Sequence, residues 1–191
     1  MTGGYRQSAT TSNTNAHMPF DQASALIYEW SATYTSGTSA GLYLFASTAT
    51  GAERGNSYRI WQDAMSVKIY ENASDVATLR ASFAAANAAG QTHSYQAIYD
   101  PLTGKLQVWR DNVALGSWTD ATPLTSGSHL SLRTDGSNVL FDDSDHLKAQ
   151  RAGVSFFVWG TVRACTPGLS SSCRCLSARS AVRAPLCTSI R

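Results

Sequence analysis

The stretch His93–Asp111, which reads HSYQAIYDPLTGKLQVWRD, decides the fold class of this 191-residue chain. It contains two runs in which apolar and polar residues alternate, joined by the segment PLTG at 101–104. Proline fixes φ and glycine tolerates a positive φ, so this segment is typical of a tight turn. The sequence therefore predicts an antiparallel hairpin with strands over 93–100 and 105–111.

The same pattern continues on both sides of this hairpin. Short runs of aromatic, β-branched and aliphatic residues recur along the chain, separated by turns rich in Gly, Ser, Asp and Asn. The sequence has no amphipathic helix of three turns and no alternation of strands with helices. We therefore predict an all-β fold, an antiparallel two-sheet jelly-roll sandwich of about ten strands. The other predicted strands cover 25–34, 41–47, 57–63, 66–71, 78–83, 113–119, 129–134 and 139–141.

The composition is that of a hydroxyl-rich β protein. Charged residues make up 15% of the chain, against about 25% in an average soluble domain. This deficit argues against a coiled coil and most helical bundles. The longest apolar run, Val154–Val162, is about half as long as the roughly 20 residues of a membrane helix, so no membrane span is expected. Residues 1–16 lack the apolar core of a signal peptide.

The chain divides near residue 145 into two parts of different composition. Residues 1–145 hold eight of the 15 Lys and Arg residues and all 13 Asp and Glu residues, whereas residues 146–191 hold seven basic residues and no acidic one. We expect a folded domain over 1–145 and an irregular basic tail over 146–191. The tail is interpreted either as a disordered extension or as the product of a shifted reading frame. It contains all four cysteines, Cys165, Cys173, Cys175 and Cys187.

Alternation along the middle strands separates two sets of side chains, because neighbouring residues of a strand point to opposite faces. One set is aliphatic, and we expect Ile60, Ile69, Val108 and Leu132 to be buried between the sheets. The opposite set is polar or aromatic and is expected to lie together on one outer sheet face. Its candidate ligand-binding members are Arg59, Trp61, Lys68, Tyr70, Gln107 and Trp109.

This second set has the chemistry of a sugar platform. Aromatic rings stack on the apolar faces of pyranose rings, and the polar side chains beside them bind hydroxyl groups. The patch is therefore a candidate glycan site. The alternative is that the three rings pack beneath a long loop, such as 84–92 or 119–128.

The residues that other chemistries need are scattered or absent. The sequence has no G-x-S-x-G motif, and none of its four histidines has an evident catalytic partner. The cysteines include no C-x₂-C pair, which argues against zinc. The basic tail can contact phosphate groups without specificity, but no motif indicates a specific nucleic-acid partner.

An acidic cluster near the end of the predicted domain leaves two interpretations open. Its carboxylate and amide oxygens suit calcium. An Asp-Gly turn and acidic caps on an edge strand explain the same residues without a metal. No other cofactor is expected. The residues concerned are Asp135, Asn138, Asp142, Asp143 and Asp145.

Three segments resemble the concanavalin A-like lectin/glucanase superfamily, in particular the laminin G-like jelly rolls of bacterial surface and secreted proteins. They are SYRIW at 57–61, DPLTGKLQVWRDN at 100–112 and VLFDD at 139–143. The resemblance covers about residues 3–143. It implies a jelly roll whose last strand lies near its first, an extracellular or cell-surface location, and in some relatives a calcium ion at the rim. The usual opening strand is missing, and residues 1–7 resemble its end.

What this superfamily does is less uniform than its fold, since such domains bind glycans, bind proteins or space other domains. Its glucanase branch carries an E-x-D-x-x-E string, which this chain lacks; its only glutamates are Glu29, Glu53 and Glu71. We therefore predict a non-catalytic carbohydrate or cell-surface recognition module of a larger extracellular protein. The alternatives are a structural spacer or protein-interaction domain without a ligand site and, less favoured, a glucanase-like hydrolase.

Overall fold

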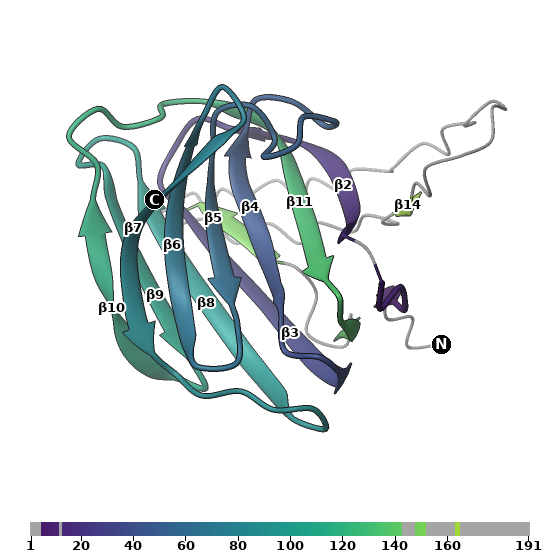
Figure 1. The fold of residues 1–191 in the computed structure, drawn as a ribbon. Helices are drawn as coiled ribbons and strands as arrows, with labels where there is room; N and C mark the ends of the chain where they lie inside the picture. The colour runs from purple at the N-terminus through teal and green to yellow at the C-terminus, as the bar shows by residue number, and fades with distance from the viewer. Residues whose placement is uncertain (1–4, 12, 143–147, 152–162, 165–191) are drawn as a thin grey trace, which may run out of the picture.

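The computed structural model describes residues 5–11, 13–142, 148–151 and 163–164, which form two antiparallel sheets packed face to face (Figure 1). Sheet A has the spatial order β1 (Tyr5–Gln7), β12 (Asn138–Asp142), β3 (Leu26–Ser36), β8 (Thr92–Asp100), β9 (Lys105–Arg110) and β10 (Val113–Thr119), and β13 (Lys148–Arg151) also pairs with β3. Sheet B has the order β14 (Arg163–Ala164), β2 (Asn13–Gln22), β11 (Gly127–Asp135), β4 (Ala40–Ala46), β5 (Ser57–Gln62), β6 (Ser66–Ala73) and β7 (Val76–Ala84). The predicted all-β sandwich is confirmed. Within these residues no helix is long and apolar enough to cross a membrane.

The hairpin that decided the fold class is formed by β8 and β9. Tyr99 pairs with Leu106 across it. The carboxylate of Asp100 accepts hydrogen bonds from the backbone N–H of Leu102 at 3.0 Å and from the hydroxyl of Thr103 at 2.9 Å. These two bonds close the turn between the strands, which Pro101 and Gly104 predicted from the sequence.

The core lies between the sheets and combines aliphatic side chains with tyrosines. The four predicted core residues, Ile60, Ile69, Val108 and Leu132, are all buried. The hydroxyls of the buried tyrosines pair with one another, Tyr58 of sheet B with Tyr99 of sheet A at 3.1 Å, and Tyr34 with Tyr95, both of sheet A, at 3.2 Å. Because each hydroxyl has a partner, a large ring can be buried without leaving a polar atom unsatisfied. Burial raises the pKa of Tyr99 to about 12, although the hydrogen bond with Tyr58 acts in the opposite direction.

Two strands precede the first strand that the sequence predicted. The ten-residue strand β2 pairs with β11, so that Ala16 lies opposite Leu132. Its sequence, NTNAHMPFDQ, is mostly polar and contains Pro19, and such residues are depleted in strands. The short strand β1 pairs with β12, where Tyr5 lies opposite Phe141. The last predicted strand therefore lies beside the first strand of the chain, as the resemblance implied.

Two short strands come from the region expected to form an irregular tail. Strand β13 pairs with β3, and β14 pairs with β2. The sequence did not predict that these two short strands pair with the sheets. The four cysteines, together with Asp143 and Asp145 of the calcium hypothesis, lie outside the described residues. The domain boundary near 145 and the reading-frame hypothesis remain predictions.

Candidate functional site

Four of the six predicted binding residues lie side by side on the outer face of sheet B. In the pair of β5 and β6, Arg59 lies opposite Tyr70 and Trp61 lies opposite Lys68. Ile60, between the two β5 residues, is buried in the core. Since side chains alternate along a strand, the four flanking residues point away from the core. The sequence therefore predicted the shared outward orientation of these four side chains correctly.

The other two predicted residues belong to the opposite side of the molecule. Gln107 and Trp109 lie on β9 in sheet A, where the alternating Leu106 and Val108 are buried. The prediction that all six residues share one face is therefore wrong. Alternation indicates which side chains of a strand point away from the core, but a sandwich has two outer faces with the same alternation. Only the pairing of the strands tells these faces apart.

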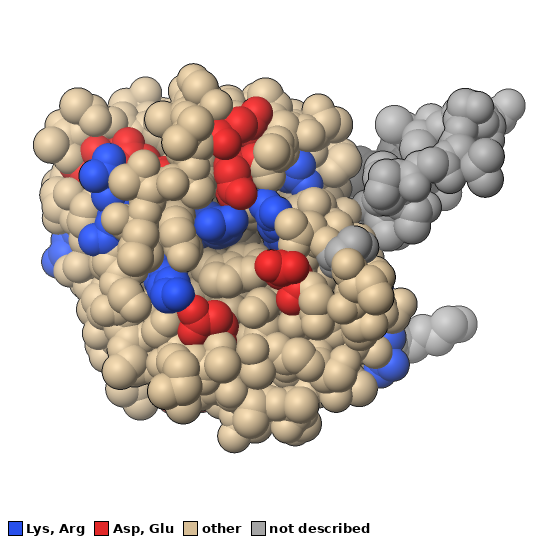
Figure 2. Space-filling model, viewed as in Figure 1, with Lys and Arg blue, Asp and Glu red and all other residues tan. Residues whose placement is uncertain are grey.

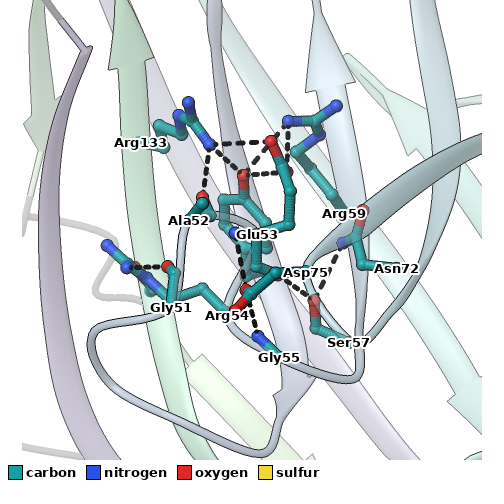
Figure 3. Close-up of polar contacts among 12 residues, drawn as sticks. Gly51, Ala52, Glu53, Arg54, Gly55, Ser57, Arg59, Asn72, Asp75 and Arg133 are labelled. Carbon is teal, nitrogen blue, oxygen red and sulfur yellow. Dashed lines mark hydrogen bonds and ion pairs between the residues drawn. The ribbon is translucent and has the colours of Figure 1, made fainter.

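A charged network that includes Arg59 occupies the centre of the sheet B face (Figure 3). The carboxylate of Glu53 lies 2.7 Å from Arg59 and 3.2 Å from Arg133, so it bridges the two guanidinium groups. The hydroxyl of Tyr43 donates to Glu53 at 2.7 Å and accepts from Arg133 at 2.6 Å. Arg133 also donates to the carbonyl oxygen of Ala52 at 2.9 Å. These bonds fix the donor groups of two strands around one acidic side chain.

The loop between β4 and β5 carries Glu53 and is itself held in place. One carboxylate oxygen of Asp75 accepts from the backbone N–H of Gly55 at 2.7 Å and of Glu53 at 2.9 Å. These bonds, that from Gly55 first, lower the pKa of Asp75 below its usual value. The buried side chain of Arg54 donates to the hydroxyl of Ser131 on β11 at 3.1 Å. The loop is therefore tied to the turn between β6 and β7 through Asp75 and to β11 through Ser131.

Two aromatic rings flank Arg59 in this network, that of Trp61 on β5 and that of Tyr70 on β6. The guanidinium carbon of Arg59 lies 4.2 Å from the ring centre of Tyr70 and 5.3 Å from that of Trp61. Beyond the rings, Lys68 forms an ion pair with Asp63 at 2.5 Å. Burial raises the pKa of Asp63, but the bonds from Lys68 and from nearby backbone and hydroxyl groups outweigh it, so the pKa is lowered.

The space-filling view looks directly onto this face (Figure 2). Charged side chains of both signs gather over the middle strands of sheet B and surround a hollow in the centre of the face. The arrangement offers donors in the two arginines, acceptors in the carboxylates and an aromatic surface in Trp61. Among the described residues, no group of three or more His, Cys, Asp or Glu side chains is placed to hold a metal ion. The calcium hypothesis remains a prediction.

Three residues of this network were absent from the predicted site. Arg133 alternates with the buried Leu132 on β11, so its outward orientation was visible in the sequence. The outward orientation of Tyr43 could not be read from the sequence, because every residue of β4 is buried on both faces and the strand shows no alternation. Glu53 lies in a loop, where no periodicity exists. Its position depends on Asp75, which is 22 residues away in the sequence.

Comparisons with known proteins find similarity in structure alone. No family model matches the chain, and no curated protein sequence matches it. The carbohydrate-binding module CBM66 from Bacillus subtilis is 13% identical with a TM-score of 0.58, over 73% of this chain and 88% of that one. The carbohydrate recognition domain of Emp46p is 14% identical with a TM-score of 0.52, over 74% of this chain and 86% of that one.

A third match is sheep galectin-11 in complex with glycerol. It is 18% identical with a TM-score of 0.50, over 65% of this chain and 91% of that one. At these identities the matches establish the fold. The chain has a two-sheet jelly-roll sandwich similar to those of these three proteins. The narrower laminin G-like form has no matching family model.

Proposed function

We propose that this chain is a non-catalytic, lectin-like module that binds a saccharide on the outer face of sheet B. The observation that carries the proposal is the position of Glu53, held between Arg59 and Arg133 beside the ring of Trp61. Sugars present hydroxyl groups that both donate and accept, together with apolar C–H faces. A face that combines guanidinium donors, carboxylate acceptors and an indole ring complements both features.

The internal bonds of the network also favour binding. Because Glu53 and Arg133 are already fixed by Tyr43 and by the backbone of Ala52, little side-chain freedom is lost when a ligand arrives. A shallow sugar site of this kind desolvates little surface, so we expect dissociation constants in the micromolar to millimolar range.

The structural matches support this proposal through their fold. Two of them are described as a carbohydrate-binding module and a carbohydrate recognition domain. The hydroxyl-rich, weakly charged composition is compatible with work outside the cell or at its surface, where we place the module. The laminin G-like form remains part of this proposal and rests on the sequence resemblance.

The positions of the glutamates argue against a hydrolase. Glycosidases place two carboxyl groups on either side of one bond, about 5–5.5 Å apart in retaining enzymes. Here Glu53 is bound by two arginines, Glu71 is paired with Arg80 at 2.8 Å, and Glu29 lies in the other sheet. We expect no release of reducing sugar from β-glucan.

One observation favours a second candidate, a spacer or protein-interaction domain without a ligand site. The guanidinium of Arg59 covers part of Tyr70 and is itself largely buried, with 12% of its side chain exposed. In this interpretation the network packs over the outer face of sheet B and closes that face to ligands.

Binding measurements on variants separate the two candidates. The full chain would be screened on a glycan array, and the affinity of its strongest oligosaccharide would then be measured by calorimetry. We expect Trp61→Ala to weaken binding about tenfold or more, because it removes the stacking surface, while Trp61→Phe retains part of the affinity. Met65→Ala is the matched control, since Met65 is exposed in the turn of the same hairpin. Absence of binding across the whole array would leave the spacer as the better account, and binding that is unchanged in Trp61→Ala would reject the outer face of sheet B as the site.

A further inference from the structure

The outer face of sheet A contains a depression that is separate from the sheet B network. It has a volume of about 390 Å³, within the range of roughly 300–1,000 Å³ typical of small-ligand sites. Its polar and aromatic lining comes from three neighbouring strands and one turn. Besides the buried Trp30 and Tyr95, the lining residues are Glu29 and Ser31 of β3, Ser94 and Gln96 of β8, Trp109 of β9, and Asn112.

Strand register explains why this part of the face is hollow. Glu29, Gln96 and Trp109 lie opposite one another across β3, β8 and β9, and form a row of large side chains. Two residues further along, Ser31 lies opposite Ser94. Because these serines are small, the surface drops beside the large row. The core residues beneath, such as Tyr95, are buried and give the depression a firm floor.

The turn between β9 and β10 forms a fixed rim. Asp111 and Asn112 both have positive φ, at 53° and 63°, which is the backbone form of a tight hairpin turn. The carboxylate of Asp111 accepts from the backbone N–H of Ser94 at 3.0 Å and lies 2.7 Å from Nδ1 of His93. The turn is therefore anchored to β8, and Asn112 is held at the edge of the depression.

From this geometry we propose that sheet A carries a second saccharide site, formed by Trp109, Glu29, Gln96 and Asn112. The indole of Trp109 provides the surface on which a sugar ring stacks. The amide of Gln96 donates to one oxygen of Glu29 at 2.8 Å, which orients the carboxylate. Glu29 then accepts from sugar hydroxyls in charge-assisted hydrogen bonds, and the two amide side chains both donate and accept.

The two sites share no residue and lie on opposite faces of the sandwich. A module with one site on each face can join two glycan chains. It gains avidity on surfaces that carry many copies of the glycan. The second site does not depend on the first. It is present even if the proposed function on sheet B fails, and the experiment below keeps the two outcomes apart.

The tryptophan indole N–H groups report on each face separately. The chain contains five tryptophans, and each gives its own signal in a two-dimensional ¹⁵N–¹H spectrum. Trp61→Phe and Trp109→Phe variants assign the two signals that matter. Lactose, cellobiose, sucrose and the leading oligosaccharides of the glycan array are then titrated into the labelled full chain at up to millimolar concentrations.

We expect a saturable shift of the Trp109 signal and of the side-chain amide signals of Gln96 and Asn112, and we expect these shifts to persist in Trp61→Ala. Glu29→Gln should weaken binding at Trp109 about tenfold, since a hydrogen bond to a charged group is lost, and should leave binding at Trp61 unchanged. Met65→Ala serves as the control for both faces.

Two results would overturn the second site. One is a Trp109 signal that no saccharide moves. The other is a Trp109 shift that disappears in Trp61→Ala, because the signal would then report the other face. A shift at Trp109 without one at Trp61 would confirm the second site and reject the proposed site on sheet B. The reverse pattern would do the opposite.

Discussion

The ring of Trp61 lies against Gly41 on the outer face of sheet B. The two residues are direct partners in the pairing of β4 with β5. A Cβ atom at position 41 would lie 2.8 Å from Cε3 of Trp61 and 2.1 Å from the carbonyl oxygen of Ile60. The absent side chain therefore makes room for the indole, which lies over the neighbouring strand. This contact orients one of the candidate stacking surfaces.

Gly41→Ala should destabilise the protein and displace the ring. Overpacking of a tight site costs about 1–3 kcal/mol, and the clash with the Ile60 carbonyl is with backbone, which yields less readily than a side chain. Unfolding in urea, followed by fluorescence, measures the loss. Gly90→Ala is the comparison, because nothing lies within 4 Å of a Cβ there and only its positive φ is strained. A smaller loss in Gly41→Ala than in Gly90→Ala would show that the sheet opens easily at this point.

Glu53→Gln tests the bridge between the two arginines. Glu53 has 18% of its side chain exposed and each arginine 12%, so removal of the negative charge leaves two poorly solvated guanidinium groups facing each other. We expect a loss of about 2 kcal/mol in the free energy of unfolding. Glu71→Gln is the matched control, because its partner Arg80 is 42% exposed and such pairs contribute about 0–1 kcal/mol. Equal losses in the two variants would contradict the special role of Glu53.

The strands that build this site could be predicted from the sequence, but their distribution between the sheets could not. Alternation around Ile60 and Ile69 identified the outward residues of β5 and β6, because a one-residue shift would place them in the core. Trp109 has the same alternation on β9. Trp109 belongs to sheet A because β8, the hairpin partner of β9, pairs with β3. Strands β3 and β8 are far apart in the sequence. Local pattern carries no information about such pairings.

The positions of the loop residues of the site could not be predicted from the local sequence either. Glu53 is positioned by two backbone bonds to Asp75 and by contacts with β11, so its place depends on tertiary structure.

The tyrosine-rich core was also unexpected. Tyr58 can be buried because its hydroxyl donates to Asp120 at 2.6 Å and accepts from the backbone N–H of Leu124 at 2.9 Å. Partners this distant in the sequence leave no periodic signal.

Acid should loosen the loop that carries Glu53. The folded protein lowers the pKa of Asp75 below its ordinary value of 3.8 through bonds from the N–H groups of Gly55 and Glu53. The stabilising effect of these bonds is therefore complete above about pH 4 and is lost as the pH falls through the lowered pKa. We expect the amide ¹H shifts of Gly55 and Glu53 to titrate together, with a midpoint below 3.8.

Asp75→Ala provides the control for this titration. It should abolish the shared transition and increase hydrogen exchange at the two amides at neutral pH, while amides of the β8–β9 hairpin keep their protection. A midpoint above 3.8 in the unaltered chain would contradict the bonding pattern, since it would mean that the fold disfavours the ionised carboxylate.

The stability of Trp61→Ala distinguishes a binding platform from a packed ring. Trp61 is half-buried on an outer face, next to the guanidinium of Arg59, so its removal should cost less than about 1.5 kcal/mol, as for a side chain only partly withdrawn from water. Trp30→Ala is the matched comparison, because Trp30 is 6% exposed and stacks on Tyr95 with ring centres 5.2 Å apart. Truncation of such a core aromatic costs about 3–5 kcal/mol. Urea unfolding of both variants, compared with their glycan affinities, distinguishes the two roles of the Trp61 ring.

If Trp61→Ala proves as destabilising as Trp30→Ala, the ring of Trp61 is a structural element that secures β4 to β5. Any loss of glycan binding in that variant would then follow from disruption of the sheet, and the spacer would become the better account of this face.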